Sequence, residues 1–264
     1  MQVIQIKALF FDIDGTLVSF NTHKIPQSTV DALTEAKRNG VKIYISTGRP
    51  KMIINNLSQI ESLIDGYITT NGARCFVGDT TVCEHPICQE DVHKVVADAE
   101  KNDYPVIVVG EKHLAIHHIT PIVNDIFVKG LGVDCLDFHT DINDLEGENI
   151  LQLTPFCTEE QEAVLMPTLQ NCTSGRWHPA FTDITAGDAD KGKGLHAMAK
   201  FLNLNITETM AFGDGGNDIT IIQEAGVGVA MGNARDHVKA IADYVTTSVD
   251  EDGVKNALLH FGVI

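Results

Sequence analysis

Two pairs of aspartates have the spacing expected of a metal-binding or acid–base site. Asp12 and Asp14 follow one short apolar run of the chain, and Asp214 and Asp218 follow another. Residues two apart on a continuing strand share one face of it, and Gly15 allows the chain to turn sharply just afterwards. For an isolated pair, capping or turn aspartates are the simpler structural interpretation.

Taken together, the two acidic pairs favour a cation between them. The carboxyl ends of parallel strands lie at one edge of a sheet, so both pairs would meet there. Carboxylates that repel one another require a cation, and oxygen ligands suit Mg²⁺, which keeps waters and accepts phosphate oxygens. The expected magnesium ligands are Asp12, Asp14, Asp214 and Asp218.

Two further places in the chain offer groups that suit phosphate oxygens. Thr47-Gly48-Arg49 supplies a hydroxyl, backbone N–H groups and a guanidinium. We predict that this segment ends a strand and opens a helix that runs to about Leu63. The alternative to a phosphate-binding role is a plain N-cap for that helix. Lys191 begins a later helix, where the helix dipole disfavours a cation, so its position indicates a functional role.

The elements that must position these residues alternate between strands and helices. The predicted strands are 7–11, 41–46 and 66–69, and the helix between the first two is expected to be capped by Ser28. This β-α-β-α-β series predicts a parallel sheet with helices on both faces and ligands beyond the carboxyl ends of its strands.

A different pattern of predicted elements between residues 83 and 185 indicates an inserted domain. Amphipathic segments there alternate with paired strand-like runs at 106–109 and 114–118. After Lys191 the alternation of strands and helices resumes, with strands predicted at 210–213 and 227–231. The expected fold class is α/β: a Rossmann-like, doubly wound parallel sheet over residues 1–82 and 186–264, with an inserted α+β cap over residues 83–185.

Composition limits the partners and the location of the protein. With 19 basic and 36 acidic residues, the 264-residue chain carries a formal charge of −17 and repels nucleic acid and anionic membranes. The motif residues described above suit a small-molecule phosphate ester, an anion that would need local compensation from a metal, basic side chains or helix N-termini, and no protein partner is indicated. No signal peptide pattern or 18-residue apolar stretch occurs, and no C-x-x-C pair, so a cytoplasmic protein with reduced thiols is expected.

Four segments resemble, in order, the motifs of the haloacid dehalogenase (HAD)-like superfamily. They are FFDIDGTL at 10–17, ISTGR at 45–49, KGKGL at 191–195 and GDGGND at 213–218. The insertion, and Asn71-Gly72-Ala73 before it, are similar to the Cof-like sugar-phosphatase branch, whose α+β cap closes over the site. The match covers the whole chain.

The resemblance implies an Mg²⁺-dependent phosphatase that hydrolyses small phosphate monoesters, above all sugar (hexose) phosphates. Asp12 would be the nucleophile, forming an aspartyl-phosphate, and Asp14 would protonate the leaving oxygen and then deprotonate water. The ion would be held by Asp12, the backbone carbonyl of Asp14 and Asp214, while Asp218 could bind it directly or through water. The groups implied to hold phosphoryl oxygens are Thr47, Lys191 and Asn217, with Gly48 and Arg49 beside them.

Three residues outside this set leave alternatives open. Lys193 replaces Lys191 as the phosphate-binding lysine if the register of the third motif is shifted by two residues. Arg176 and Trp177 are the aromatic–basic pair of the insertion, and we consider them as substrate contacts, although a buried tryptophan is the simpler interpretation.

Two other functions use similar residues. A phosphomutase of the same superfamily uses the same nucleophile but returns the phosphoryl group to the sugar. A phosphoaspartate signalling module also combines strand-end aspartates, a hydroxyl, a lysine and Mg²⁺. It has no need for the Asp14 acid–base group or for a lid of roughly a hundred residues, because lids that exclude water serve turnover.

Overall fold

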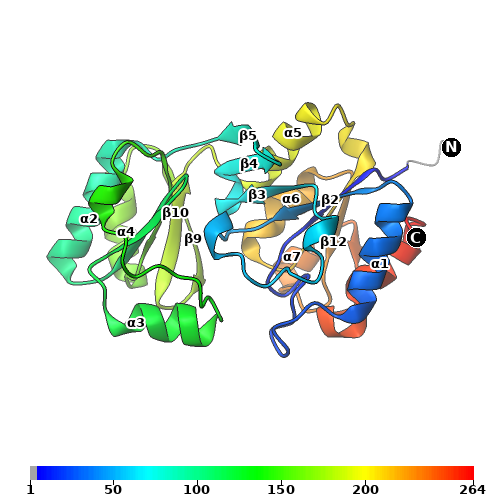
Figure 1. The fold of residues 1–264 in the computed structure, drawn as a ribbon, viewed down its shortest axis with the longest axis horizontal. Helices are drawn as coiled ribbons and strands as arrows, with labels where there is room; N and C mark the ends of the chain where they lie inside the picture. The colour runs from blue at the N-terminus through cyan, green and yellow to red at the C-terminus, as the bar shows by residue number, and fades with distance from the viewer. Residues whose placement is uncertain (1–4) are drawn as a thin grey trace. The chain divides into compact units, whose positions relative to one another are not determined.

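The computed structural model describes residues 5–264, apart from the side chain of Trp177. The chain divides into two compact units (Figure 1). The first contains the described residues up to Gly48, together with Asn56–Cys83 and Asp190–Ile264, and the second contains Arg49–Asn55 and Glu84–Ala189. The sequence analysis placed residues 49–55 with the sheet domain, whereas the structure groups them with the insertion.

The first unit is built on an eight-stranded sheet with the order β13-β12-β11-β1-β2-β3-β4-β5. The strands from β13 to β3 pair in parallel, and β4 runs antiparallel to β3. The predicted α/β class with a parallel sheet is therefore confirmed. The strands are β1 (Ala8–Phe11), β2 (Lys42–Ser46), β3 (Gly66–Thr69), β4 (Arg74–Val77), β5 (Thr80–Glu84), β11 (Thr209–Gly213), β12 (Val227–Ala230) and β13 (Tyr244–Val245).

The central strand β1 is buried on both faces of this sheet. Ala8 and Phe10 pack in one apolar cluster with residues of α5 and α6, while Leu9 and Phe11, which point the other way, are also fully buried. Such a strand reads as a continuous apolar run, which is why the sequence predicts it well. The helices of this unit are α1 (Gln27–Arg38), α5 (Lys191–Phe201), α6 (Ile219–Glu224), α7 (Asp236–Lys239) and α8 (Gly253–His260).

The predicted helix between residues 47 and 63 is not formed. The structure has only two short 3₁₀ turns there, Lys51–Ile53 and Glu61–Leu63. The segment between them contains β-branched residues and the pair Asn55-Asn56, which are weak helix formers. In addition, Ile53 is buried in the core of the second unit, and this packing outweighs helical propensity.

The expected cap of α1 was also wrong. Pro26 occupies the N-cap position, and no side chain caps the helix. Ser28 lies in the first turn, and its hydroxyl donates a hydrogen bond to the carboxylate of Asp252 at 2.5 Å. Ser28 was predicted to cap the N-terminus of α1, but its side chain instead bonds to the segment that precedes α8.

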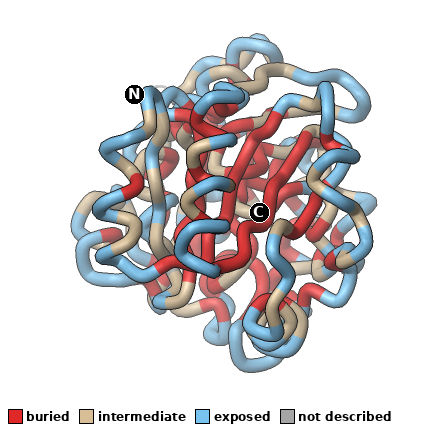
Figure 2. The backbone as a smooth tube through the Cα atoms, turned by 90° about the vertical axis from the view of Figure 1, so that its left-hand side faces the viewer, coloured by how far each residue is buried: buried red, intermediate tan, exposed pale blue. Residues whose placement is uncertain are grey.

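The second unit is an antiparallel sheet with helices, as predicted for the insertion. Its strand order is β7-β6-β8-β10-β9, and one face packs against α2 and α4 while the other holds an aromatic cluster of Phe127, Phe156 and Phe181. Figure 2 shows the buried residues concentrated along the strands. The elements are α2 (Gln89–Asn102), β6 (Val106–Gly110), β7 (Leu114–His117), α3 (Pro121–Val123) with a π-helical continuation (Asn124–Gly130), β8 (Ile150–Pro155), α4 (Glu159–Leu165), β9 (Cys172–His178) and β10 (Phe181–Ala186).

Within residues 5–264, no disulfide joins any of the cysteines. None of the helices in this described part combines the length and the apolar character needed to cross a membrane.

Candidate active site

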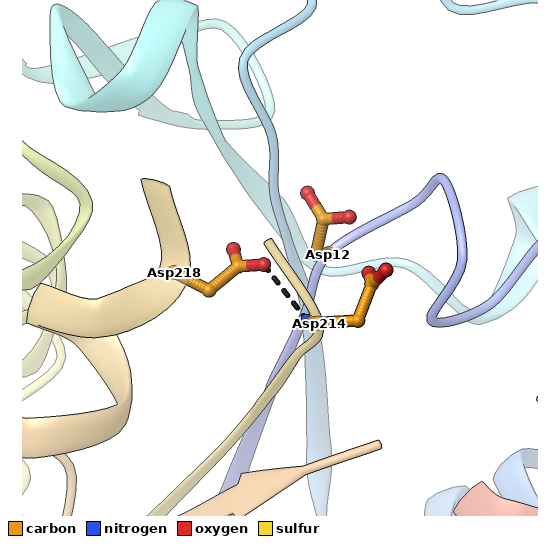
Figure 3. Close-up of side chains that lie close together, drawn as sticks. All are labelled: Asp12, Asp214 and Asp218. Atoms are coloured by element: carbon orange, nitrogen blue, oxygen red, sulfur yellow. Dashed lines mark hydrogen bonds between the residues drawn. The ribbon is translucent and has the colours of Figure 1, made fainter. Parts of the chain in front are cut away.

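Parallel pairing brings two of the predicted aspartates to one edge of the sheet. β1 pairs with β11 so that Phe11 lies beside Phe212, and the N–H of Asp12 donates to the carbonyl of Phe212 at 3.1 Å. Asp12 and Asp214 therefore leave neighbouring strands at nearly the same level. Asp218 joins them, and one oxygen from each of the three carboxylates lies within 4.8 Å of the others (Figure 3).

Asp218 is held entirely by donors from the protein. Its Oδ2 accepts hydrogen bonds from the backbone N–H groups of Asp214 at 3.0 Å and Gly215 at 2.9 Å, the first of which is drawn in Figure 3. Its Oδ1 accepts a hydrogen bond from Lys191 Nζ at 2.6 Å. The carboxylate therefore fixes the loop after β11 and the lysine together.

Lys191 is the buried cation of the cluster. Its side chain is 0% exposed, and besides Asp218 it contacts Asp12, with 2.7 Å between Nζ and Oδ1. Burial alone lowers the pKa of Lys191, but the charges of Asp12 and Asp218 outweigh it and raise the pKa above its ordinary value, so the ammonium stays charged. Lys193, the alternative lysine, is 55% exposed and pairs with Asp190.

One lysine does not neutralise the aspartates around it. Burial raises the pKa of Asp12 well above its usual value, although Lys191 opposes this, and Asp218, Asp214 and Asp14 raise it further. Burial and the charge of Asp218 raise the pKa of Asp214 to about 7. Burial and mutual repulsion thus disfavour the ionised form of these two carboxyls when Lys191 is the cation beside them. A divalent cation with oxygen ligands would offset this repulsion, so the donor set fits Mg²⁺.

Asp214 is oriented by residues that the sequence analysis did not single out. Thr16 Oγ1 donates to Asp214 Oδ1 at 3.0 Å, and Asn233 Nδ2 lies 3.4 Å from Asp214 Oδ2 while donating to the carbonyl of Gly15 at 2.8 Å. Gly15 has a φ of +84°, and a Cβ there would lie 2.4 Å from Asp214 Oδ2. Asn233 follows β12, and the rule that found the aspartates, polar residues at parallel strand ends, would also have found it.

Asp14 lies beside this cluster rather than within it. The chain leaves β1 after Phe11, and the backbone of Asp14 forms an isolated bridge to Val18. Its side chain is half-buried and is not among the three whose oxygens converge. The two residues therefore do not share a strand face as the alternation predicts, because the strand ends before Asp14.

The remaining predicted phosphate contacts are divided between the units. Thr47 is buried at the end of β2, where its N–H donates to the carbonyl of Ile68 at 2.9 Å. Gly48 follows in the first unit, but Arg49 belongs to the second. Asn217 is exposed on the loop after β11.

The two substrate contacts considered in the insertion have different outcomes. Arg176 donates to Glu162 at 2.7 Å and to the carbonyls of Pro179 at 3.1 Å and Cys157 at 3.0 Å. Its guanidinium thus ties β9 to α4 and to the turn before β10. The side chain of Trp177 lies outside the described part of the structure.

A strained turn follows β3 close to these loops. Thr70, Asn71 and Gly72 have φ values of +49°, +52° and +95°, so three consecutive residues are in the left-handed region. A non-glycine residue there costs on the order of 1–3 kcal/mol, and a β-branched residue such as Thr70 is rarely found there. The sequence analysis noted Asn71 only as part of a resemblance and gave it no role.

Comparisons with known proteins agree on one family. Residues 9–258 match the family model of the haloacid dehalogenase-like hydrolases. A putative phosphatase from Bacillus subtilis (strain 168) is 32% identical, over 98% of both chains. A second protein of that organism, a 5-amino-6-(5-phospho-D-ribitylamino)uracil phosphatase, is 29% identical over 98% of this chain and 96% of its own.

Solved structures agree over nearly the whole chain. A sugar phosphatase of HAD subclass IIB is 48% identical, with a TM-score of 0.91 over 98% of this chain and 100% of its own. A HAD phosphatase from Bacteroides thetaiotaomicron is 38% identical, with a TM-score of 0.87 over 100% of this chain and 97% of its own.

Proposed function

The chain belongs to the haloacid dehalogenase-like hydrolases, and we propose that it is an Mg²⁺-dependent phosphatase that hydrolyses sugar phosphates through an aspartyl-phosphate on Asp12. The observation that carries this proposal is the buried Asp12 carboxylate, held by Lys191 at the sheet edge beside Asp214. A carboxylate in such a setting can act as a nucleophile toward phosphorus.

The first half of the reaction is transfer of the phosphoryl group to Asp12. Lys191 holds one carboxylate oxygen of Asp12 and so limits its rotation, which leaves the other oxygen for attack. As the new oxygen–phosphorus bond forms, the ester bond breaks and Asp14 gives its proton to the leaving sugar oxygen. In the second half Asp14 takes a proton from water, which attacks the phosphorus and releases inorganic phosphate and Asp12.

Mg²⁺ would be held by side-chain oxygens of Asp12 and Asp214 and by the backbone carbonyl of Asp14. When bound, the ion would neutralise charge on the phosphoryl oxygens and on the aspartates. Both oxygens of Asp218 already accept hydrogen bonds from the protein. We therefore propose that Asp218 positions Lys191 and the Asp214 loop instead of binding the ion directly.

The phosphoryl oxygens would be bound by Lys191, Thr47 and Asn217. Phosphoryl transfer depends mainly on positioning and on charge neutralisation, so this set with one metal ion is sufficient for the chemistry. The absence of a helix after Thr47 means that loop N–H groups, including that of Gly48, would take the place of a helix N-terminus.

We propose sugar phosphates as the substrates because a subclass IIB sugar phosphatase is 48% identical to this chain, over 98% of this chain and 100% of its own. Selection among them would fall to the insertion, predicted over residues 83–185, because Asp12, Asp14, Lys191 and Asp214 all lie in the first unit. A phosphomutase would return the phosphoryl group to the sugar, so accumulation of free phosphate separates the two activities.

Removal of the metal should silence the enzyme. We expect phosphate release from hexose phosphates to stop in EDTA, to return with Mg²⁺ and to return poorly with Ca²⁺, which prefers looser and higher coordination. A phosphate-release assay over sugar phosphates, nucleotides and aryl phosphates tests this and the substrate class together. Release that persists unchanged after exhaustive chelation would refute the metal role, and release from nucleotides alone would refute the sugar assignment.

Loss of the proposed acid should depend on the leaving group. In Asp14→Asn, kcat should fall most for sugar phosphates, whose alkoxide needs a proton, and least for a nitrophenyl phosphate, whose phenolate leaves without one. The measurement is kcat for both substrates in both proteins. Asp79→Asn, in the exposed turn between β4 and β5, is the matched control and should change neither value. Equal losses on both substrates would remove Asp14 as the general acid.

A further inference from the structure

We propose that Asn71 is a positioning residue of this site: its side-chain carbonyl orients the amide of Asn217 toward a phosphoryl oxygen. The proposal rests on the function proposed above, since it assigns Asn217 to the phosphoryl group. Asn71 itself need not touch the substrate.

Asn71 connects two loops that are far apart in the sequence. Its backbone N–H donates to the carbonyl of Thr47 at 3.1 Å, which ties it to the end of β2. Its side-chain Oδ1 accepts a hydrogen bond from Asn217 Nδ2 at 3.0 Å, across a sequence separation of 146 residues. The turn after β3 thus contacts both the Thr47 loop and the loop after β11.

The direction of the second hydrogen bond determines how the Asn217 amide is presented. A primary amide carries two N–H protons and one carbonyl oxygen. The Asn71 carbonyl accepts a hydrogen bond from one N–H of the Asn217 amide, so the amide cannot flip without losing this bond. The second N–H of the amide remains available to donate to an anion. Asn217 is exposed and follows Gly215-Gly216, so without this contact its side chain would sample several orientations.

Close packing shows that the position of the Asn71 amide is built into the unit. A Cβ added to Gly48 would lie 3.0 Å from Asn71 Oδ1 and 3.2 Å from Nδ2, so the amide lies directly against that glycine. A Cβ added to Gly72 would lie 2.2 Å from the carbonyl oxygen of Asp190, the residue before Lys191. The turn is therefore in contact with the chain that carries each proposed phosphate-binding side chain: Thr47, Lys191 and Asn217.

The backbone strain of this turn supports the same conclusion. Thr70 and Asn71 are both left-handed, and such residues persist only where the surrounding structure enforces them. Asparagine tolerates this conformation better than most residues, so its backbone alone could explain its presence. The alternative is therefore that Asn71 is a turn residue and its hydrogen bond to Asn217 has no effect on the site.

A second asparagine allows these two explanations to be separated. Asn203 has a φ of +54° and lies in an exposed turn after α5, where it has the same backbone conformation. Glycine accepts this conformation, so Asn71→Gly and Asn203→Gly each remove a side chain without adding backbone strain. Asn203→Gly thus shows how phosphate binding and kcat respond when an asparagine side chain is removed from a left-handed turn outside the site.

The experiment measures phosphate affinity and turnover in a double-mutant cycle. Inorganic phosphate is titrated calorimetrically into the Mg²⁺-loaded protein, and kcat is measured on a hexose phosphate. For Asn71→Gly we expect about tenfold weaker phosphate binding and a lower kcat, the size expected for one hydrogen bond to a charged group. Asn217→Ala should lose at least as much, and the double variant should be no worse than Asn217→Ala alone. Asn203→Gly should match the wild type.

Two results would overturn the proposal. In the first, Asn71→Gly binds phosphate as tightly as the wild type does. In the second, the double variant loses as much phosphate-binding free energy as the two single variants lose together. If Asn71→Gly does not fold, Gly48→Ala displaces the same amide from the other side. Gly48→Ala should then weaken phosphate binding less in the Asn217→Ala background than in the wild type. A wild type that hydrolyses no ester would refute the proposed function, while the phosphate titration would still measure the coupling between Asn71 and Asn217.

Discussion

Asp12→Asn should lower phosphate release by at least about three orders of magnitude while the protein stays folded. An amide is a poor nucleophile and a poor ligand for Mg²⁺, so both proposed roles of Asp12 are lost together. Its carbonyl oxygen can still accept the hydrogen bond from Lys191, which is why the fold should survive. The checks are steady-state kinetics on a hexose phosphate and a thermal melt.

The first unit offers a matched control for this substitution. Asp65 also pairs with lysines, Lys37 and Lys42, but it precedes β3 and so lies at the opposite end of the strands. Asp65→Asn removes the same charge and should leave kcat unchanged, even if it lowers the melting temperature. Residual activity of Asp12→Asn above about a tenth of the wild type would rule out Asp12 as the nucleophile.

Lys191→Met should affect both activity and stability. Its ammonium is fully buried between Asp12 and Asp218, so its removal leaves two buried carboxylates without their cationic partner. Breaking a buried ion pair in this way costs about 3–5 kcal/mol of unfolding free energy. Phosphate release should fall at the same time, because the group proposed to neutralise the transferring phosphoryl oxygens is lost. Urea unfolding and kcat on one preparation measure the two effects.

Lys193→Met is the control within the same helix. Lys193 pairs with Asp190 at the surface, so its loss should cost at most about 1 kcal/mol and leave turnover unchanged. In the Asp12→Asn background, Lys191→Met should lower the free energy of unfolding less than in the wild type. The carboxylate of Asp12, one of the two charges that lose their cationic partner, is already absent there. An inactive Lys193→Met beside an active Lys191→Met would reverse the assignment of the two lysines.

The sequence predicts the convergence of Asp12 and Asp214 because one rule governs it. Asp12 and Asp214 follow strands that are buried on both faces, and such strands read as uninterrupted apolar runs. Parallel pairing then forces their ends together without any detailed knowledge of loops. Lys191 was found through a different signal, a cation at a helix N-terminus where the helix dipole disfavours it.

The predictions that depended on tertiary contacts were less successful. Residues 51–63 do not form the expected helix because Ile53 packs in the core of the second unit, and no local pattern carries that information. Ser28 bonds to Asp252 and not to its own helix, a contact between residues 224 positions apart. The Asn71–Asn217 hydrogen bond was missed for the same reason, since neither amide is unusual in its own segment.

The order of the strands also has a consequence for how the chain is made. β1 meets β2 soon after synthesis begins, but Ala8 pairs on its other side with Thr209, about 200 residues later. At roughly 5–20 residues per second, a ribosome needs on the order of 10–40 seconds to supply that partner. Until then the Ala-Leu-Phe-Phe strand presents an unpaired apolar edge, which is a template for aggregation. The strand that positions Asp12 is therefore also a segment that can aggregate while the chain is being made.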